Sequence, residues 1–459
     1  RLEVTIALRC QYEINGRGFL ALNHHRRIYS AVNLGLFHRS VSSDNSDNVA
    51  AAGEDTHKLV IDVKIARIYE RCYSLFSHRR KQERKLLGEG IADIELSKDL
   101  SVLGRIHDLR CVDSALGAEC ALVRHNIISG THALSIVLFG ILRPGDIMLS
   151  VTGKPYDTLD EVIGINGADG TGSLADFGVE YRQVDMKGGV DLEGVKNALS
   201  EYGQRVKMVF IQRSKGYMNR KTLSCEEIGE VVKLTKSMSD AFVVVDNCYG
   251  EFVEECEPTA YGADLIIGSL IKNPGGGMAE TGGYLAGTAK AVELCSYRFT
   301  CPGVGLECGA TLDQNKNMYR GLFYAPHTVA ASLKTAALAA YTFEKLGYEV
   351  SPRYDEDRHD IIQTIQFLAK EPLCAFCRGI QVGSPVDAYV TPEPWDMPGY
   401  SDEVIMAAGT FVSGASIELS ADAPIRAPYT AFFQGGLTYE SGKYGIMTSA
   451  EYLLKELEK

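Results

Sequence analysis

The sequence predicts an α/β fold with a mostly parallel central sheet, followed by a smaller α+β C-terminal domain. From about Ala118, short apolar runs rich in β-branched residues alternate with helical segments, which is typical of a sheet with crossover helices. The chain has 459 residues, which is enough for two or three domains. Hydrophobic residues make up 45% and charged residues 23%, as expected for a globular protein with an apolar core.

The expected elements follow one another along the chain. In the first domain we expect a helix from Ala133 and another over 225–238, together with strands over 146–151, 179–185, 206–211, 241–246, 264–269 and 283–287. The smaller domain is expected to hold a long helix from about Thr328 to Leu346, strands near 361–367 and 404–419, and a terminal helix over 441–457.

These elements suggest four parts: 1–55, a leader or disordered tail; 56–117, a divergent N-terminal segment; 118–327, the large domain; and 328–459, the smaller C-terminal domain. Residues 1–43 contain six arginines and two acidic residues, a composition typical of organelle transit peptides, although a disordered tail explains it equally well. The expected location is the cytoplasm, or a plastid or mitochondrion if the leader is a transit peptide.

The charge balance excludes several classes of partner. The net charge is −12 and the pI is near 5.4, which disfavours non-specific binding to nucleic acid or to an anionic membrane surface. No apolar run reaches the roughly 18 residues that cross a bilayer.

The 12 cysteines are scattered, and the one C-x-x-C pair, Cys374 and Cys377, has no second pair at zinc spacing. We therefore expect no metal site.

Two residues that follow predicted strands suggest a reactive site at one sheet edge. Lys272 comes after the strand 264–269, among apolar residues and glycines, where desolvation is expected to lower the pKa of its amine and favour attack on a carbonyl. Alternatively, Lys272 is an ordinary lysine whose ammonium group reaches solvent. Asp246 ends an apolar strand, so its carboxylate needs a cationic partner; a helix cap or a structural ion pair explains it as well.

Three further features of the sequence contain residue types that are suited to binding a phosphate group and a flat ring. Ser129, Gly130 and Thr131 precede a helix, whose free N–H groups and dipole favour a phosphate, although an ordinary capped helix start looks the same. Ser269 can add a hydroxyl to the same phosphate. Tyr156 follows a strand and can stack on a flat ring, or can lie in a surface turn. Each of these features is ambiguous by itself. Their order along the chain, which is phosphate loop, aromatic residue, Asp and Ser-x-x-Lys, makes them specific when taken together.

Longer strings in the sequence resemble a known family. The sequence is similar to the fold-type-I pyridoxal-phosphate enzymes of cysteine and methionine metabolism, close to cystathionine lyases, and more narrowly to the aluminium-resistance or methionine γ-lyase-family group. The resemblance covers about three quarters of the chain, from Ala118 onward. The matching strings are 129–133, 151–158, 245–251, 268–277, 391–400 and 414–422.

The resemblance implies a PLP-dependent transferase-like fold, with pyridoxal 5'-phosphate bound in 118–327. Lys272 would bind the cofactor covalently, and Asp246 would pair with the pyridine nitrogen. The phosphate would be held by Gly130, Thr131 and Ser269, while Tyr156 would stack on the ring. Arg426 is the expected partner of the substrate carboxylate, and Arg213 is the second candidate.

The expected function is a carbon–sulfur lyase that acts on a sulfur amino acid by β- or γ-elimination, releasing thiol, ammonia and a 2-oxo acid. Lys272 would act as the base, with Tyr156 as a further proton donor or acceptor. A homodimer or homotetramer and a small-molecule amino-acid substrate are expected. The alternatives are an aminotransferase or aldolase on the same scaffold, and a cofactor-binding pseudoenzyme. The last is motivated by the segment from Leu87 to Val112, which lacks the tyrosine of related lyases.

Overall fold

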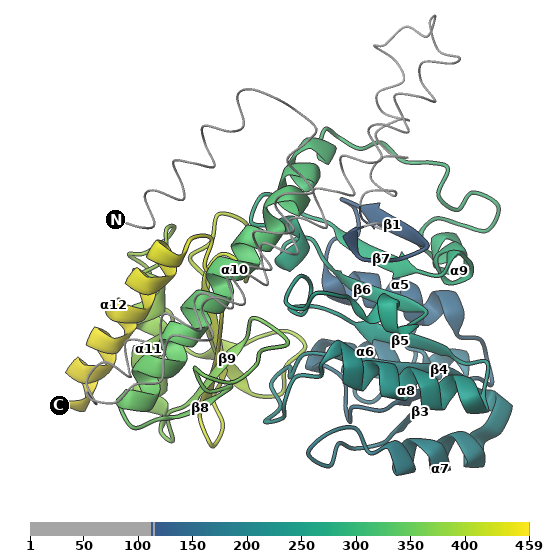
Figure 1. Cartoon of the computed structure of the whole chain (residues 1–459), viewed down its shortest axis with the longest axis horizontal. Coiled ribbons are helices and arrows are strands. Elements are labelled where there is room, and N and C mark those ends of the chain that lie inside the picture. Colours follow the sequence, from purple (N-terminus) through teal and green to yellow (C-terminus); the bar gives the residue numbers. More distant parts are fainter. Residues whose placement is uncertain (1–111, 113–114, 459) are drawn as a thin grey trace, which may run out of the picture. The chain divides into compact units, whose positions relative to one another are not determined.

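The computed structural model describes residue 112 and residues 115–458 (Figure 1). The leader and nearly all of the divergent N-terminal segment, including the stretch 87–111, lie outside the described residues. Two β-sheets, each with its own helices, make up the described chain. Within this part of the chain, no helix combines the length and the apolar character that a membrane span requires.

The first sheet has seven strands in the order β1-β7-β6-β5-β4-β2-β3. The neighbours from β3 to β6 pair in parallel, and β7 is antiparallel to both β6 and β1. Its strands are β1 (Cys120–Arg124), β2 (Ile147–Ser150), β3 (Glu180–Gln183), β4 (Val206–Gln212), β5 (Phe242–Asp246), β6 (Leu265–Ser269) and β7 (Gly283–Gly287). The predicted mostly parallel sheet is therefore confirmed.

Helices cover both faces of this sheet, because alternate side chains of its strands point to opposite sides. In β5, Val243 and Val245 pack in the core that contains the apolar residues of α7 (Leu192–Tyr202) and α8 (Cys225–Met238). Val244 packs in the opposite core. That core holds α5 (Gly130–Ile141) and α9 (Ala289–Phe299), with the short α6 (Asp160–Ile163) nearby. Short 3-10 turns lie at 157–159, 175–177, 203–205, 258–261 and 273–275.

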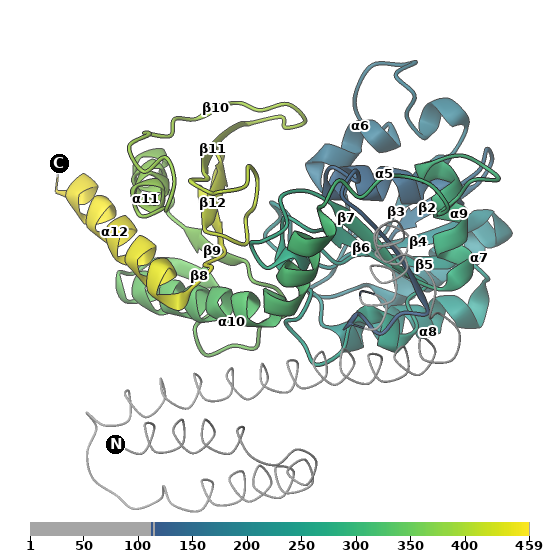
Figure 2. The ribbon, with the colours of Figure 1, turned by 90° about the horizontal axis from the view of Figure 1, so that it is seen from above.

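The second sheet has six antiparallel strands in the order β10-β11-β12-β13-β9-β8. Its strands are β8 (Glu349–Ser351), β9 (Gln363–Gln366), β10 (Trp395–Asp396), β11 (Glu403–Ala407), β12 (Ser420–Pro424) and β13 (Thr430–Gln434). It shares a core with α10 (Asn315–Lys345), α11 (Lys370–Val382) and α12 (Tyr439–Leu457). Figure 2 shows α10 running from the first sheet domain to the second.

Most predicted elements are confirmed, and two differ. The long helix α10 begins at Asn315, well before the expected start at Thr328, and includes Pro326. The expected strand over 404–419 ends at Ala407. Beyond it, the Glu418 carboxylate accepts hydrogen bonds from the backbone N–H groups of Phe411 and Val412, at 2.7 and 3.0 Å, which holds the following segment as a loop.

Candidate active site

The carboxyl ends of three neighbouring parallel strands bring polar side chains to one edge of the first sheet. β4 ends at Gln212, β5 at Asp246 and β6 at Ser269. Gln212 lies directly opposite Asp246 in the ladder between β4 and β5. This edge is where open α/β sheets bind ligands, because the strands end there and the loops open outward.

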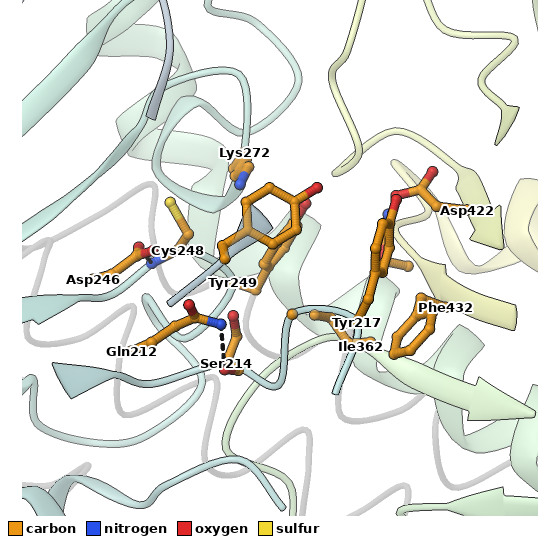
Figure 3. Close-up of a pocket in the computed structure, with 13 residues that line it drawn as sticks. Gln212, Ser214, Tyr217, Asp246, Cys248, Tyr249, Lys272, Ile362, Asp422 and Phe432 are labelled. Carbon is orange, nitrogen blue, oxygen red and sulfur yellow. Dashed lines mark hydrogen bonds between the residues drawn. The ribbon is translucent and has the colours of Figure 1, made fainter. Parts of the chain in front are cut away.

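A pocket that is partly open to solvent lies at this edge (Figure 3). The first sheet and its loops contribute most of the lining, and the second sheet contributes the opposite wall. The lining from the first sheet domain is Tyr156, Gln212, Ser214, Gly216, Tyr217, Asp246, Cys248, Tyr249 and Lys272. The lining from the second is Ile362, Asp422, Phe432 and Gln434.

Lys272 lies just beyond β6, and its Nζ is 4.0 Å from the centroid of the Tyr249 ring. Burial works against its charge, but the thiol of Cys248, the phenol of Tyr249 and the carboxylate of Asp246 together hold the pKa of Lys272 above its usual value. The sequence predicts a lowered pKa for this amine. That prediction is wrong in direction, because acidic groups surround the amine and outweigh its desolvation.

Asp246 lines the same pocket as Lys272, as the sequence predicted. Its side chain is buried, and its Oδ1 accepts a hydrogen bond of 3.1 Å from the backbone N–H of Cys248. Burial raises the pKa of Asp246, against the opposing effect of the Lys272 charge. Asp246 is therefore oriented by the backbone and has a carboxylate that a nearby cation stabilises.

The first turn of α5 lies beside this edge. Ser129 caps the helix by accepting a hydrogen bond of 3.0 Å from the N–H of His132. A Cβ on Gly130 would lie 3.4 Å from Sγ of Cys248 and 3.7 Å from Cβ of Ser269. The helix start therefore approaches the end of β6 closely. It does so where an anion would meet both the N–H groups of the helix and the Ser269 hydroxyl.

Two of the predicted residues, Thr131 and Tyr156, take part in further polar contacts. The hydroxyl oxygens of Thr131 and Thr158 are 2.9 Å apart and share a hydrogen bond. The hydroxyl of Tyr156 is hydrogen-bonded to that of Tyr400. The Tyr156 ring lies edge-on to that of Tyr217, with centroids 5.7 Å apart. Tyr156 is thus a pocket residue and not a surface turn tyrosine.

Arg213, the second candidate for the substrate carboxylate, lies outside the pocket lining. Its guanidinium is fully buried and donates to Oδ1 of Asn247 at 2.7 Å and to the carbonyl oxygen of Gly250 at 3.0 Å. It also forms ion pairs of 2.7 Å with Glu254 and 3.5 Å with Glu257. These contacts make Arg213 part of a structural ion-pair network.

Arg426, the first candidate, lies on the surface beside the pocket. Its Nη1 forms an ion pair of 2.7 Å with Oδ2 of Asp402, and its side chain is 41% exposed. Its Nη2 donates a long hydrogen bond of 3.4 Å to the backbone oxygen of Tyr217, which lines the pocket. Arg426 is therefore close to the pocket without lining it.

Several pocket residues were missed by sequence reasoning. Gln212 ends a strand at the same edge as Asp246, so its position was a usable signal. Its Oε1 is buried without a hydrogen-bond partner. Asp422 lies on β12 between two alanines. Only the alternation of side chains along that strand could have identified it as a pocket residue. Tyr217 and Tyr249 lie in loops and carried no periodic signal.

These residues fit pyridoxal 5'-phosphate by their chemistry. An amine, a buried carboxylate and a free amide oxygen face one pocket. Beside it, Gly130 leaves room at a helix start where a Cβ would contact Cys248. Lys272 suits the aldehyde, Asp246 the pyridinium nitrogen, and the start of α5 the phosphate.

The chain is similar to several known proteins. The sequence profile of the family named Methionine gamma-lyase matches residues 101–454. The Bacillus subtilis protein YnbB is 54% identical over 343 residues, which cover 74% of this chain and 81% of YnbB. The crystal structure of a carbon–sulfur lyase involved in aluminium resistance from Clostridium novyi is 45% identical. It covers 88% of this chain and 94% of its own, with a TM-score of 0.79.

A more distant structure bears on the fold alone. The pyridoxal-5'-phosphate-dependent protein YhfS from Escherichia coli is 15% identical, with a TM-score of 0.56 over 85% of this chain and 97% of its own. Its fold is that of this chain. From the extent of the profile match and the identity to its relatives, the chain belongs to the methionine gamma-lyase family.

Proposed function

We propose that this protein is a pyridoxal-phosphate-dependent carbon–sulfur lyase that acts on a sulfur amino acid by β- or γ-elimination. Substrate and water would be converted to a thiol, ammonia and a 2-oxo acid. The observation that supports this most is the convergence of Lys272 and Asp246 on one pocket. Family membership supports the same class of reaction.

Each residue has a distinct task in this proposal. Bound pyridoxal phosphate supplies an electron sink for the α carbon of the substrate. Nζ of Lys272 would hold the cofactor and, once the amino group of the substrate has replaced it there, would take the proton from the α carbon. The carboxylate of Asp246 keeps the pyridine nitrogen protonated. Tyr156 stacks on the ring, and its hydroxyl is a second proton donor or acceptor for elimination at the γ carbon.

The remaining site residues bind and orient. Gly130, Thr131 and Ser269 would hold the phosphate at the start of α5. Arg426 remains our proposed partner for the substrate carboxylate, because its guanidinium already donates to the backbone of the pocket residue Tyr217. Rotation of the Arg426 side chain away from Asp402 would be required, and solvent exposure of that ion pair makes the rotation inexpensive.

A visible absorption spectrum tests the cofactor assignment. Protein purified with pyridoxal phosphate is expected to show the absorption band of the lysine-bound cofactor. Lys272→Ala is expected to lack that band, while Lys290→Ala, which alters a lysine outside the pocket, keeps it. Equal spectra for the unsubstituted protein and Lys272→Ala would contradict the role of Lys272.

Product analysis separates the proposed reaction from its alternatives. Release of free thiol, ammonia and 2-oxo acid from cystathionine, methionine or cysteine supports the lyase. An amino-acid product that requires an added 2-oxo acid would indicate an aminotransferase, and an aldehyde released from a β-hydroxy amino acid would indicate an aldolase. A protein that binds the cofactor but forms none of these products would be a pseudoenzyme.

We also propose that the protein forms a homodimer or homotetramer, as the resemblance implied. Size-exclusion chromatography with light scattering checks this, and a monomer with full activity would contradict it. The curated relative YnbB is bacterial, which gives no support to a plastid or mitochondrial location. A cytoplasmic location is our proposal.

A further inference from the structure

The pocket has an acidic wall opposite Lys272. In β12, Ala421 and Ala423 point into the core of the second sheet domain, and Asp422 between them points the other way, into the pocket. Figure 3 shows Asp422 across the pocket from Asp246 and Lys272. Strand alternation therefore fixes a carboxyl group on the wall farthest from the residues assigned to the cofactor.

Asp422 is held in place by neutral groups and forms no ion pair with a described residue. Nε2 of Gln434 donates a hydrogen bond of 3.2 Å to its Oδ2, and donates another of 3.0 Å to Oγ of Ser420. None of the ion pairs among the described residues includes Asp422. Burial raises the pKa of Asp422 to about 6, against the opposing effects of Gln434 and Lys272, so the carboxyl is mainly ionised at neutral pH. A shielded carboxylate without a cation favours one that arrives with a ligand.

Aromatic rings complete this end of the pocket. The Tyr217 ring, directed toward Asp422 in Figure 3, lies 5.0 Å from Phe432 and 5.6 Å from Tyr400, measured between centroids. The faces of such rings attract cations, and a carboxylate beside them adds charge and hydrogen-bond acceptors. An ammonium group matches both features, because it is a compact cation with hydrogen atoms to donate.

The position of this wall determines which part of a substrate it would contact. The α-amino group of a substrate has to reach Lys272, on the first sheet domain. Asp422 belongs to the second sheet and lies across the pocket, so a substrate held at Lys272 would direct the portion beyond its sulfur atom toward Asp422. A cation bound there belongs to the leaving thiol and not to the amino acid backbone.

We propose that Asp422 is a specificity-determining residue that binds an ammonium group carried by the leaving-group side of the substrate. The preferred substrates are then sulfur amino acids whose thiol portion bears a primary amine. This inference rests on the proposed lyase function, and it adds a substrate class to it. Gln434 acts as a positioning residue, since its amide orients the Asp422 carboxylate.

Two cysteine derivatives of nearly equal shape test the inference by turnover. S-(2-aminoethyl)-L-cysteine ends in an ammonium where S-propyl-L-cysteine ends in a methyl group. For the unsubstituted protein, kcat/KM is expected to be about tenfold or more higher for the aminoethyl compound. Asp422→Asn is expected to remove that preference, mainly by raising KM for the aminoethyl compound. It should leave kcat/KM for the propyl compound within about threefold.

Matched variants test whether the negative charge of Asp422, rather than a general change in the pocket, determines the preference for the aminoethyl compound. Asp422→Glu keeps the charge and is expected to retain part of the preference. Asp396→Asn removes an exposed carboxylate from β10 of the same sheet and is expected to leave the preference unchanged. The band of the lysine-bound cofactor, at its usual position in every variant, shows that each has folded.

A binding experiment separates failure of this inference from failure of the lyase function. L-lysine has no carbon–sulfur bond, and L-2-aminoheptanoic acid is its uncharged analogue. Titration of the cofactor-loaded protein, followed by its visible spectrum, is expected to give about tenfold tighter binding of lysine. This difference should be absent in Asp422→Asn. If no 2-oxo acid forms from any substrate but this difference persists, the lyase proposal fails and the ammonium site stands.

Three results would overturn the inference. The first is equal turnover and equal binding of the charged and neutral ligands by the unsubstituted protein. The second is an equal loss for both members of each pair in Asp422→Asn, which would make Asp422 a residue of the reaction or of folding. The third is a preference for the ammonium compounds that survives Asp422→Asn.

Discussion

The hydroxyl of Tyr284 donates a hydrogen bond of 2.8 Å to Oε1 of Glu251, and both side chains are fully buried. Oε2 of Glu251 has no hydrogen-bond partner. A Cβ on Gly268 would clash with Oε1 of Glu251, so the absence of a side chain at this position of β6 makes room for the carboxyl group. Burial raises the pKa of Glu251 to about 8, against the effect of the Tyr284 bond. At neutral pH this carboxyl is mainly protonated.

Glu251→Gln is expected to change how stability depends on pH. Because the pKa of Glu251 rises from 4.5 to about 8 on folding, its contribution to stability is complete below pH 4.5 and is lost as the pH rises through 8. The slope is on the order of 1 kcal/mol per pH unit between these values. The Gln variant lacks that slope, so it should gain stability relative to the unsubstituted protein from pH 5 to pH 8. Urea unfolding across this range measures it, and parallel curves would contradict the buried, protonated Glu251.

Arg213→Met is expected to destabilise the protein strongly. The substitution leaves the carboxylates of Glu254 and Glu257 without their buried cation, which costs on the order of 3–5 kcal/mol. Arg182→Ala is the control, because it breaks an exposed ion pair with Glu180 that is worth less than about 1 kcal/mol. Denaturant unfolding measures both. A small effect of Arg213→Met on stability with a large increase in KM would instead make Arg213 a substrate ligand.

Arg426→Ala is expected to weaken substrate binding with little change in stability. Loss of a charged hydrogen bond to the substrate carboxylate should raise KM by about tenfold or more and change kcat much less. The ion pair with Asp402 is exposed, so the unfolding free energy should change by less than about 1 kcal/mol. Steady-state kinetics with one sulfur amino acid provides the measurement. An unchanged KM would rule out the assignment of Arg426.

Tyr249→Leu is expected to make Lys272 easier to deprotonate. The Tyr249 ring lies 4.0 Å from Nζ and stabilises the ammonium form, so its removal should raise the fraction of neutral amine about tenfold. Tyr249→Phe keeps the ring but removes the phenol hydroxyl, so it separates the effect of the ring on Nζ from that of the hydroxyl group. Acetylation rates of Lys272 in cofactor-free protein, followed by mass spectrometry across pH, report this fraction. Identical rates for the Leu and Phe variants would show that the ring has no such role.

Much of the fold could be predicted because it depends on local pattern. The apolar run before Asp246 and the alternation of strands with helices are properties of the sequence, and they predicted the parallel sheet and helix α8. The long helix α10 was predicted too short, since contacts with the rest of the domain decide whether a helix continues past Pro326. Local pattern also gave no boundary for the loop that Glu418 stabilises.

The candidate site, like the fold, could be predicted from the sequence only in part. By itself, the sequence determined which groups lie at or just beyond the ends of the parallel strands, because these residues are contiguous with the strands, and Asp246 and Lys272 followed from that. Only the tertiary structure decided what surrounds those groups: the acids that raise the pKa of Lys272, the carboxylates that occupy Arg213, and the wall that carries Asp422. These depend on distances between residues far apart in the chain, and charge interactions depend on such distances rather than on the order of residues.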